Sequence, residues 1–322
     1  MVTIRDRPQI ARLTHPTEAV RDTNPVSAGA DLAAMISTNS DFVDFILPLK
    51  ERLVLYDRTS PPAQQPKNDA TDPAKSIPQG FIDAMMVREE VFVKEQGVAL
   101  ENELDFDDRR CFTWTAYASV PGHIQPIPAN GGHPNRRQST STKLPIGTIR
   151  LVPPPNAAST HHFDKHRFMD GRPYQGPVSS LIHNGKEAFV KLGRLAILKE
   201  FRKVGVSKLL IDSALTMAHD YPYIISDPPS NAAKEELRDA VGEILDMNTD
   251  WNGLVLVHAQ IGLQKFWARW GFELDEGLGI WDEEGIDHVA MWKRLDMKTA
   301  SKATAPYSYT EEPKRFRGSM SA

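Results

Sequence analysis

The stretch Lys191–His219, KLGRLAILKEFRKVGVSKLLIDSALTMAH, decides the fold. Its first part, Leu192–Leu198, is apolar with one arginine and predicts a buried strand. Its last part, Val206–His219, places leucine, alanine and methionine at helical spacing on one face. A basic turn with a single glycine, Gly205, lies between them. The stretch therefore predicts a strand, a turn and a helix in direct succession.

The basic turn has the chemistry of a phosphate site. A helix that starts directly after a strand and a turn offers unpaired N–H groups, and such groups bind phosphate oxygens. Gly205 lets the backbone approach a ligand closely, because it has no Cβ. Arg202, Lys203 and Lys208 add positive charge around it. A solvated helix start without a ligand is the alternative, and we favour a pyrophosphate site.

A second stretch, Val91–Asp108, reads VFVKEQGVALENELDFDD. Alone, its acidic run is typical of a solvated turn. Together with the basic turn it resembles the GNAT acetyltransferase superfamily, whose acetyl-CoA loop reads Arg/Gln-x-x-Gly-x-Gly/Ala. Arg202 and Gly205 match this loop, and Ser207 replaces its final small residue. The second stretch is similar to the bacterial-type branch of the superfamily, through Val91, Phe92, Glu95, Gln96, Glu103, Asp105 and Asp108.

Two further segments extend this resemblance. Glu284–Met291 resembles the branch's terminal Gly-Ile-x-His-x-x-Met motif, and Leu256–Gln260 completes the match. The resemblance covers Phe81 to Leu295, interrupted by insertions, and indicates a fungal-style member with long insertions.

The resemblance implies an α/β (α+β) fold with one mixed sheet. That sheet is splayed open at the acetyl-CoA cleft, with helices on both faces. It also implies acetyl-CoA as cosubstrate, with the pantetheine arm hydrogen-bonded along the edge of the central strand, and no metal. The cofactor-binding residues that it implies are Leu195, Ala196, Ile197, Arg202, Lys203, Val204, Gly205, Val206, Ser207, Lys208, Gln260, Phe266 and Trp267.

The catalytic positions depart from the family pattern. Trp267 stands where many members have the tyrosine that protonates the departing thiolate, and an indole cannot do this. Gly193 stands where related sequences often have a glutamate base. His288 is then our first candidate for the base, since imidazole titrates near neutrality, and Asp105 is the second. A structural role for His288 stays open, and His258 replaces an asparagine common at its place.

The function that follows is acetyl transfer to a primary amine by direct attack in a ternary complex. We expect a small-molecule acceptor, such as an amino sugar like glucosamine, an aryl-alkylamine or a polyamine. Glu103, Asp105 and Asp108 either attract a cationic acceptor or fix their own loop. Two alternatives remain: a protein lysine acetyltransferase, and an acetyl-CoA-binding regulatory or interaction module with little or no turnover.

Bulk properties narrow the setting. A net charge of -4 and a pI near 6.2 argue against nucleic acid as the main partner. The single Cys111 excludes an internal disulfide and a multi-cysteine metal site. No stretch is long enough to span a membrane, and the N-terminus lacks the apolar core of a signal peptide. We therefore expect a cytoplasmic protein, with the nucleus as an alternative. We expect no membrane partner, and a homodimer is one alternative for the oligomeric state.

We expect one acetyltransferase domain over residues 41–296, with an N-terminal extension (1–40) and a disordered tail (297–322). Its first strand is expected at Glu51–Asp57. Three insertions are expected, near 121–144, 156–186 and 226–250. The first has the Pro-, Gly- and Ser-rich composition of a disordered segment, and the third should carry a helix near 232–247. In the second, His161, His162, Asp164 and His166 are expected to be loop residues and not metal ligands.

Overall fold

A computed structural model describes residues 42–65, 76–121, 141–156, 167–169, 172–173, 180–227, 234–235 and 248–299. The expected N-terminal extension and the histidine cluster at 161–166 lie outside these residues. So does most of the expected helix at 232–247, of which Lys234 and Glu235 are described as helical.

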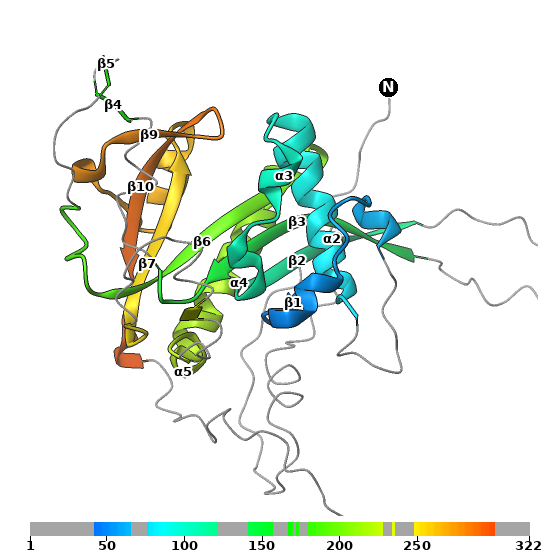
Figure 1. The fold of residues 1–322 in the computed structure, drawn as a ribbon, viewed down its shortest axis with the longest axis horizontal. Helices are drawn as coiled ribbons and strands as arrows, with labels where there is room; N and C mark the ends of the chain where they lie inside the picture. Colours follow the sequence, from blue (N-terminus) through cyan, green and yellow to red (C-terminus); the bar gives the residue numbers. More distant parts are fainter. Residues whose placement is uncertain are drawn as a thin grey trace, which may run out of the picture.

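One mixed sheet runs through the described residues (Figure 1). Its strand order is β1-β2-β3-β6-β7-β10-β9-β4-β5, with β8 paired to β10. The strands are β1 (Val43–Ile46), β2 (Phe112–Pro121), β3 (Ser141–Val152), β4 (Arg167–Met169), β5 (Arg172–Pro173), β6 (Ala188–Ile197), β7 (Trp251–Gln260), β8 (Glu273–Leu274), β9 (Ile280–Glu283) and β10 (Ile286–Arg294). β6 and β7 are parallel. Every other strand pair that the structure describes is antiparallel.

Helices flank this sheet on both sides. They are α2 (Gln79–Arg88), which continues as a π-helix (Glu89–Glu95), α3 (Leu100–Glu103), α4 (Val206–Asp220), α5 (Pro222–Ile225) and α7 (Gln264–Ala268). Short 3-10 turns lie at Lys50–Leu55, Pro62–Gln64, Phe106–Arg109, Lys199–Phe201, Ile261–Leu263, Glu276–Leu278 and Met297–Thr299. A mixed sheet with helices on both faces is the expected α/β (α+β) fold class, which is confirmed.

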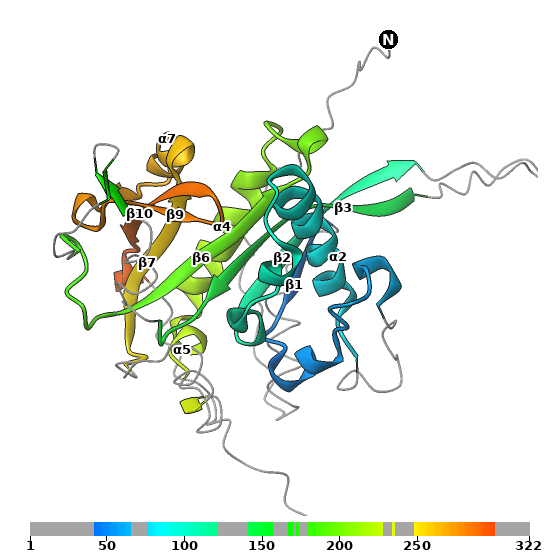
Figure 2. The same cartoon turned by 45° about the horizontal axis from the view of Figure 1, so that its top comes forward.

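Different helices cover the two faces of the sheet. On β2, Trp114 packs in the core cluster that includes α4, whereas the hydroxyl of its neighbour Thr115 donates to the Gly80 carbonyl of α2 (2.8 Å). Neighbouring strand residues point to opposite faces. α4 and α2 therefore lie on opposite sides of the sheet (Figure 2), and we call these sides the α4 face and the α2 face.

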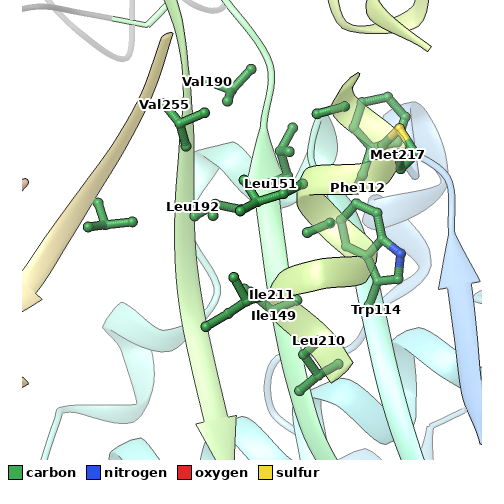
Figure 3. Close-up of a cluster of buried hydrophobic side chains, with 14 of the residues drawn as sticks. Phe112, Trp114, Ile149, Leu151, Val190, Leu192, Leu210, Ile211, Met217 and Val255 are labelled. Atoms are coloured by element: carbon green, nitrogen blue, oxygen red, sulfur yellow. The ribbon is translucent and has the colours of Figure 1, made fainter. Parts of the chain in front are cut away.

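The largest core cluster joins the sheet to α4. Figure 3 shows Leu210, Ile211 and Met217 of this helix packed against side chains of the strands. The strand residues labelled there are Phe112, Trp114, Ile149, Leu151, Val190, Leu192 and Val255. Burying one such leucine or isoleucine stabilises the fold by roughly 1.5–3 kcal/mol. This packing fixes α4, and with it the turn at its start, relative to β6.

The strand and helix expected around the basic turn are confirmed as β6 and α4. The prediction of a strand at Glu51–Asp57 is wrong, because Lys50–Leu55 forms a 3-10 helix and the edge strand is β1. Three apolar residues explain this: Leu49, Leu53 and Tyr56 recur at helical spacing, and all are buried in one cluster with α2 residues.

The expected insertion boundaries also need correction. β2 extends to Pro121 and pairs there with Ser141 of β3, so the insertion expected over 121–144 begins and ends in strands. The insertion expected over 156–186 contributes β4, which pairs with β9. The tail expected from 297 begins with an ordered turn whose Met297 packs against the main core cluster.

Candidate active site

β6 and β7 separate in the middle of the sheet. Their parallel pairing ends at Leu192 and Val257, although β6 continues to Ile197 and β7 to Gln260. Beyond this point β7 stays paired with β10 and β6 stays paired with β3, so the two strands diverge (Figure 1). We call this divergence the fork. The sheet is therefore splayed at its central strand.

The edge of β6 at the fork offers main-chain groups. The Leu198 N–H donates to the Ile146 carbonyl of β3 (2.9 Å). Near this end of β6, the main-chain N–H and C=O groups of even-numbered residues therefore point toward β3. Because main-chain groups alternate along a strand, Leu195 and Ile197 direct theirs away from β3 and toward the fork. An extended ligand can add to such an edge in the manner of another strand.

A bulge in β6 accompanies the fork. The pairing of β3 with β6 shifts between Thr148 and Arg150, and Arg194 has a φ of +50°. Bulges bend a strand and increase its twist, which separates the end of β6 from β7. The Arg194 guanidinium donates to Asp105 (3.1 Å) and to the Asn102 carbonyl (3.2 Å), so the bulge is held from the α2 face.

The turn after β6 has the features expected of a phosphate site. Gly205 has a φ of +98°, a conformation that L side chains rarely adopt, and a Cβ there would meet no atom within 4 Å. α4 begins directly afterwards, and none of the described side chains caps its first turn. Its N–H groups and its positive dipole end therefore remain available to an anion. Lys203, Val204 and Gly205 are exposed.

Arg202 differs from its expected role. Its guanidinium forms a bidentate pair with Glu95 (2.6 Å for both hydrogen bonds), and its Nε donates to the Ile197 carbonyl (2.9 Å). The hydrogen bond from Arg202 lowers the pKa of Glu95, so the pair is ionised at neutral pH. Arg202 therefore braces the turn against the π-helix, and the backbone N–H groups of the turn remain the candidate phosphate ligands.

The carboxylates of the acidic run form ion pairs with arginines. Arg88, only 1% exposed, bonds Glu103 (2.5 Å) and Asp108 (2.7 Å), which are equally buried. Arg150 pairs with Asp105 (2.6 Å) and with Asp108 (3.0 Å). Of the two readings offered by the sequence, the structure favours the second: these carboxylates fix their own loop and are not presented to a cationic acceptor.

The same contacts make Asp105 a poor base. Burial would raise the pKa of its carboxyl, but the charge and hydrogen bonds of Arg150, with Arg194 beside them, outweigh burial and hold that pKa below its ordinary range. The carboxylate also caps the 3-10 turn by accepting from the Asp107 N–H (2.9 Å). A carboxylate engaged in this way has little affinity for a further proton, so the structure speaks against our second candidate.

His288 lies on the α2 face. Its strand neighbour Val289 packs in the cluster with α4, so the imidazole points to the other side. It is 8% exposed, and its Nδ1 contacts the Ile286 carbonyl (2.8 Å), which leaves Nε2 as the acceptor of the neutral ring. Its register partner on β7 is Gln260, which lies beyond the fork. This placement suits the expected role.

Three further positions expected to bind the cofactor lie at the end of β7 and in α7. Trp267 is 5% exposed and packs against Phe266 (5.4 Å between ring centroids) and Phe272 (5.3 Å), so its indole lies in the core. Gln260 donates to Gln96 (3.1 Å), which ties the end of β7 to the segment after the π-helix.

A histidine–glutamate pair is the feature that the sequence did not predict. His258 Nδ1 lies 3.0 Å from Glu283 Oε2, and the Trp281 indole N–H donates to the same oxygen (3.2 Å). His258 already stood out as a departure from the family pattern. Glu283 carries no comparable signal, because it lies in a short acidic segment that resembles a surface turn.

No protein-family model and no curated protein sequence matches the chain. Solved structures match it in shape. One is a Lactobacillus plantarum protein assigned as an N-acetyltransferase, with 17% identity and a TM-score of 0.37 over 79% of this chain and 99% of that one. An acyl-CoA N-acyltransferase from Pseudomonas aeruginosa has 18% identity and a TM-score of 0.33, over 66% and 89% of the chains. Escherichia coli ElaA has 16% identity and a TM-score of 0.34, over 68% and 92%. At such identities and TM-scores, the function must rest on this chain's own residues.

Within the part of the chain that the structure describes, no group of three histidine, cysteine, aspartate or glutamate side chains could hold a metal ion. Among the same residues, no helix is long and apolar enough to cross a membrane.

Proposed function

We propose that this protein is an acyl-CoA-dependent N-acyltransferase that moves an acetyl group from acetyl-CoA to a primary amine of a small molecule. One observation carries the proposal: the open edge of β6 at the fork leads directly into the uncapped turn at Gly205. An edge that accepts an extended amide chain thus adjoins a turn that accepts phosphate, which is the order of groups along CoA.

The residues divide this ligand among them. The N–H groups between Val204 and Lys208 bind the pyrophosphate, aided by the helix dipole of α4 and by the charge of Lys203. The main chain of Leu195 and the N–H of Ile197 bind the pantetheine arm, because the Ile197 carbonyl already accepts from Arg202. The thioester, which supplies the activated acyl group, then lies toward the apex of the fork.

The acceptor reaches the thioester from the α2 face, opposite the helix that binds pyrophosphate. Its nitrogen must be neutral to attack, so a base on that face has to accept a proton. The paired state of Glu103, Asp105 and Asp108 removes the reason to favour a polycation. An amino sugar or an aryl-alkylamine therefore precedes a polyamine among the proposed acceptors.

The test is release of free CoA thiol from acetyl-CoA in the presence of glucosamine, phenethylamine or spermidine. We expect amine-dependent release that saturates with acetyl-CoA and is absent in a Gly205→Glu variant. Tight acetyl-CoA binding without release for any amine would instead identify a CoA-binding regulatory module. Release that needs a lysine-containing peptide would identify a protein acetyltransferase.

A further inference from the structure

His258 occupies the apex of the fork. It is the β7 residue that directly follows Val257, the last residue of β7 paired with β6. Val257 and Ala259, its strand neighbours, both pack in the cluster with α4. The imidazole of His258 therefore points to the α2 face, the side from which the proposed acceptor arrives.

A carboxylate orients this imidazole. Glu283 on β9 contacts His258 Nδ1 (3.0 Å) and accepts from the indole N–H of Trp281 (3.2 Å). Trp281 is itself buried, with its ring 5.1 Å from that of His258 in an edge-on contact and 6.3 Å from that of His288 in a stacked one. The carboxylate is thus fixed by two donors, and it holds the imidazole in one orientation.

The charges around the pair determine its protonation. Burial lowers the pKa of His258 below its ordinary value, against the opposing effect of Glu283, while Lys191 from β6 and His288 from β10 lower it further. Lys191 in turn lies 3.6 Å from Asp107 of the 3-10 turn that packs on this face. Burial would raise the pKa of Glu283, but the two imidazoles and Lys191 hold it below its ordinary range.

The tautomer follows from these directions. An ionised carboxylate can only accept a hydrogen bond, so Nδ1 of the neutral His258 ring carries the proton and Nε2 carries the lone pair. His288 differs in one respect: its Nδ1 contacts a main-chain carbonyl, which fixes a tautomer but supplies no full negative charge. A base held by an orienting carboxylate is the arrangement that favours proton abstraction.

We propose that His258, oriented by Glu283, is the base that takes the proton from the acceptor amine. The inference rests on the acyl transfer proposed above. The amine lone pair attacks the thioester carbonyl carbon, the C–N bond forms and the C–S bond breaks. CoA leaves as its thiolate and is protonated from solvent. Of the two protons that an ammonium acceptor loses, the first goes to Nε2 of His258 before the attack and from there to solvent, and the second leaves the nitrogen for solvent when the amide forms.

The test compares His258→Asn, Glu283→Gln and, as the matched control, His288→Asn. Acetyl transfer is followed as a function of pH with phenethylamine, glucosamine and spermidine, and with hydroxylamine, which is already neutral at neutral pH. For the amines that transfer, His258→Asn should lower kcat by about 10²–10⁴-fold and leave the KM for acetyl-CoA unchanged. With hydroxylamine the loss should be much smaller.

The pH profile supplies a readout that a merely structural role would not move. Activity should rise with pH through the pKa of His258. This rising limb of the pH profile should vanish in His258→Asn. Glu283 raises the pKa of His258, so Glu283→Gln should move the limb to lower pH and reduce kcat. His288→Asn should keep the limb but move it to higher pH, because His288 lowers the pKa of His258.

Two results would overturn the proposal. One is a folded His258→Asn enzyme with the wild-type limb, and the other is an equal loss for hydroxylamine and the amines. Melting temperatures show whether each variant folds, and if His258→Asn does not, an unmoved limb in Glu283→Gln is decisive. Failure of the wild type to acetylate any of these acceptors, hydroxylamine included, would contradict the proposed function as well.

Discussion

The two faces of the fork are built in different ways. The proposed cofactor side, Leu195 to Lys208, is contiguous in sequence and offers mainly backbone groups at a strand edge and at a helix start. The proposed acceptor side, on the α2 face, combines His258 and Glu283 from two strands, and there the proposed chemistry depends on side chains. A backbone site tolerates changes of side chain, whereas a side-chain site depends on each residue. Mutations should therefore affect the two faces independently.

Breaking the arginine–carboxylate cluster should have the largest effect. Arg150→Met removes one cation from Asp108, which is buried, and from Asp105, which is partly exposed. Removing one partner of a buried ion pair typically costs about 3–5 kcal/mol of stability. Urea unfolding measures this. The control is Glu187→Gln, which breaks an exposed bidentate pair with Arg294 and should cost at most about 1 kcal/mol. Similar losses in the two variants would show that the cluster does not support the acceptor side.

Gly205→Glu should disable the cofactor side alone. A side chain is strained at a φ of +98°, and a carboxylate repels phosphate. We expect acetyl-CoA affinity to fall at least about a hundredfold, equivalent to roughly 3 kcal/mol, in a calorimetric titration. Gly185→Glu is the matched control, because Gly185 also has a positive φ (+80°) and open space around a Cβ. Equal affinities for the two variants would remove the turn from the site.

Removing the ion pair between Glu95 and Arg202 should have a moderate effect. Glu95→Gln removes the charge that holds Arg202 and loosens the turn. Both side chains are partly exposed, so unfolding free energy should change by at most about 1 kcal/mol. The KM for acetyl-CoA should rise about fivefold, and the KM for the amine should stay constant. An increase in the KM for the amine alone would show that this ion pair supports acceptor binding and not acetyl-CoA binding.

Gly193→Glu should have the smallest effect on the wild-type protein. A Cβ at Gly193 meets no atom within 4 Å, so the fold should tolerate the change. Leu192 packs in the cluster with α4, so position 193 faces the acceptor side. In a His258→Asn background the new carboxylate should recover about tenfold in rate. No recovery in a stably folded double variant would separate position 193 from the proton path.

The strand and the helix of the proposed cofactor side could be predicted from the sequence because their signals are local. Strand and helix periodicity, one glycine and clustered cations all lie within one stretch, and β6 and α4 follow them. The role of Arg202 could not be foreseen, because its partner Glu95 lies in a distant helix. The brace appears only when the π-helix and the turn are brought together.

The proposed acceptor side could not be predicted in the same way, because its contacts join residues that are distant in the sequence. Arg88 and Arg150 resemble ordinary surface residues of a helix and a strand, and only the fold places them beneath the acidic run. Similarly, Glu283 acquires a role only when β9 pairs with β10 and β10 with β7. The incorrect strand at Glu51–Asp57 is a different case, because the helical spacing of Leu49, Leu53 and Tyr56 is present in the sequence itself.

Hydrogen exchange with and without acetyl-CoA tests the central claim most directly, because it reports on the backbone groups that the cofactor side is proposed to use. Acetyl-CoA should slow amide exchange in Leu195–Ile197 and Val204–Lys208 together, and leave residues 180–187 unchanged. Protection confined to other segments, or none at a saturating concentration of acetyl-CoA, would contradict the placement of an acyl-CoA site at the fork.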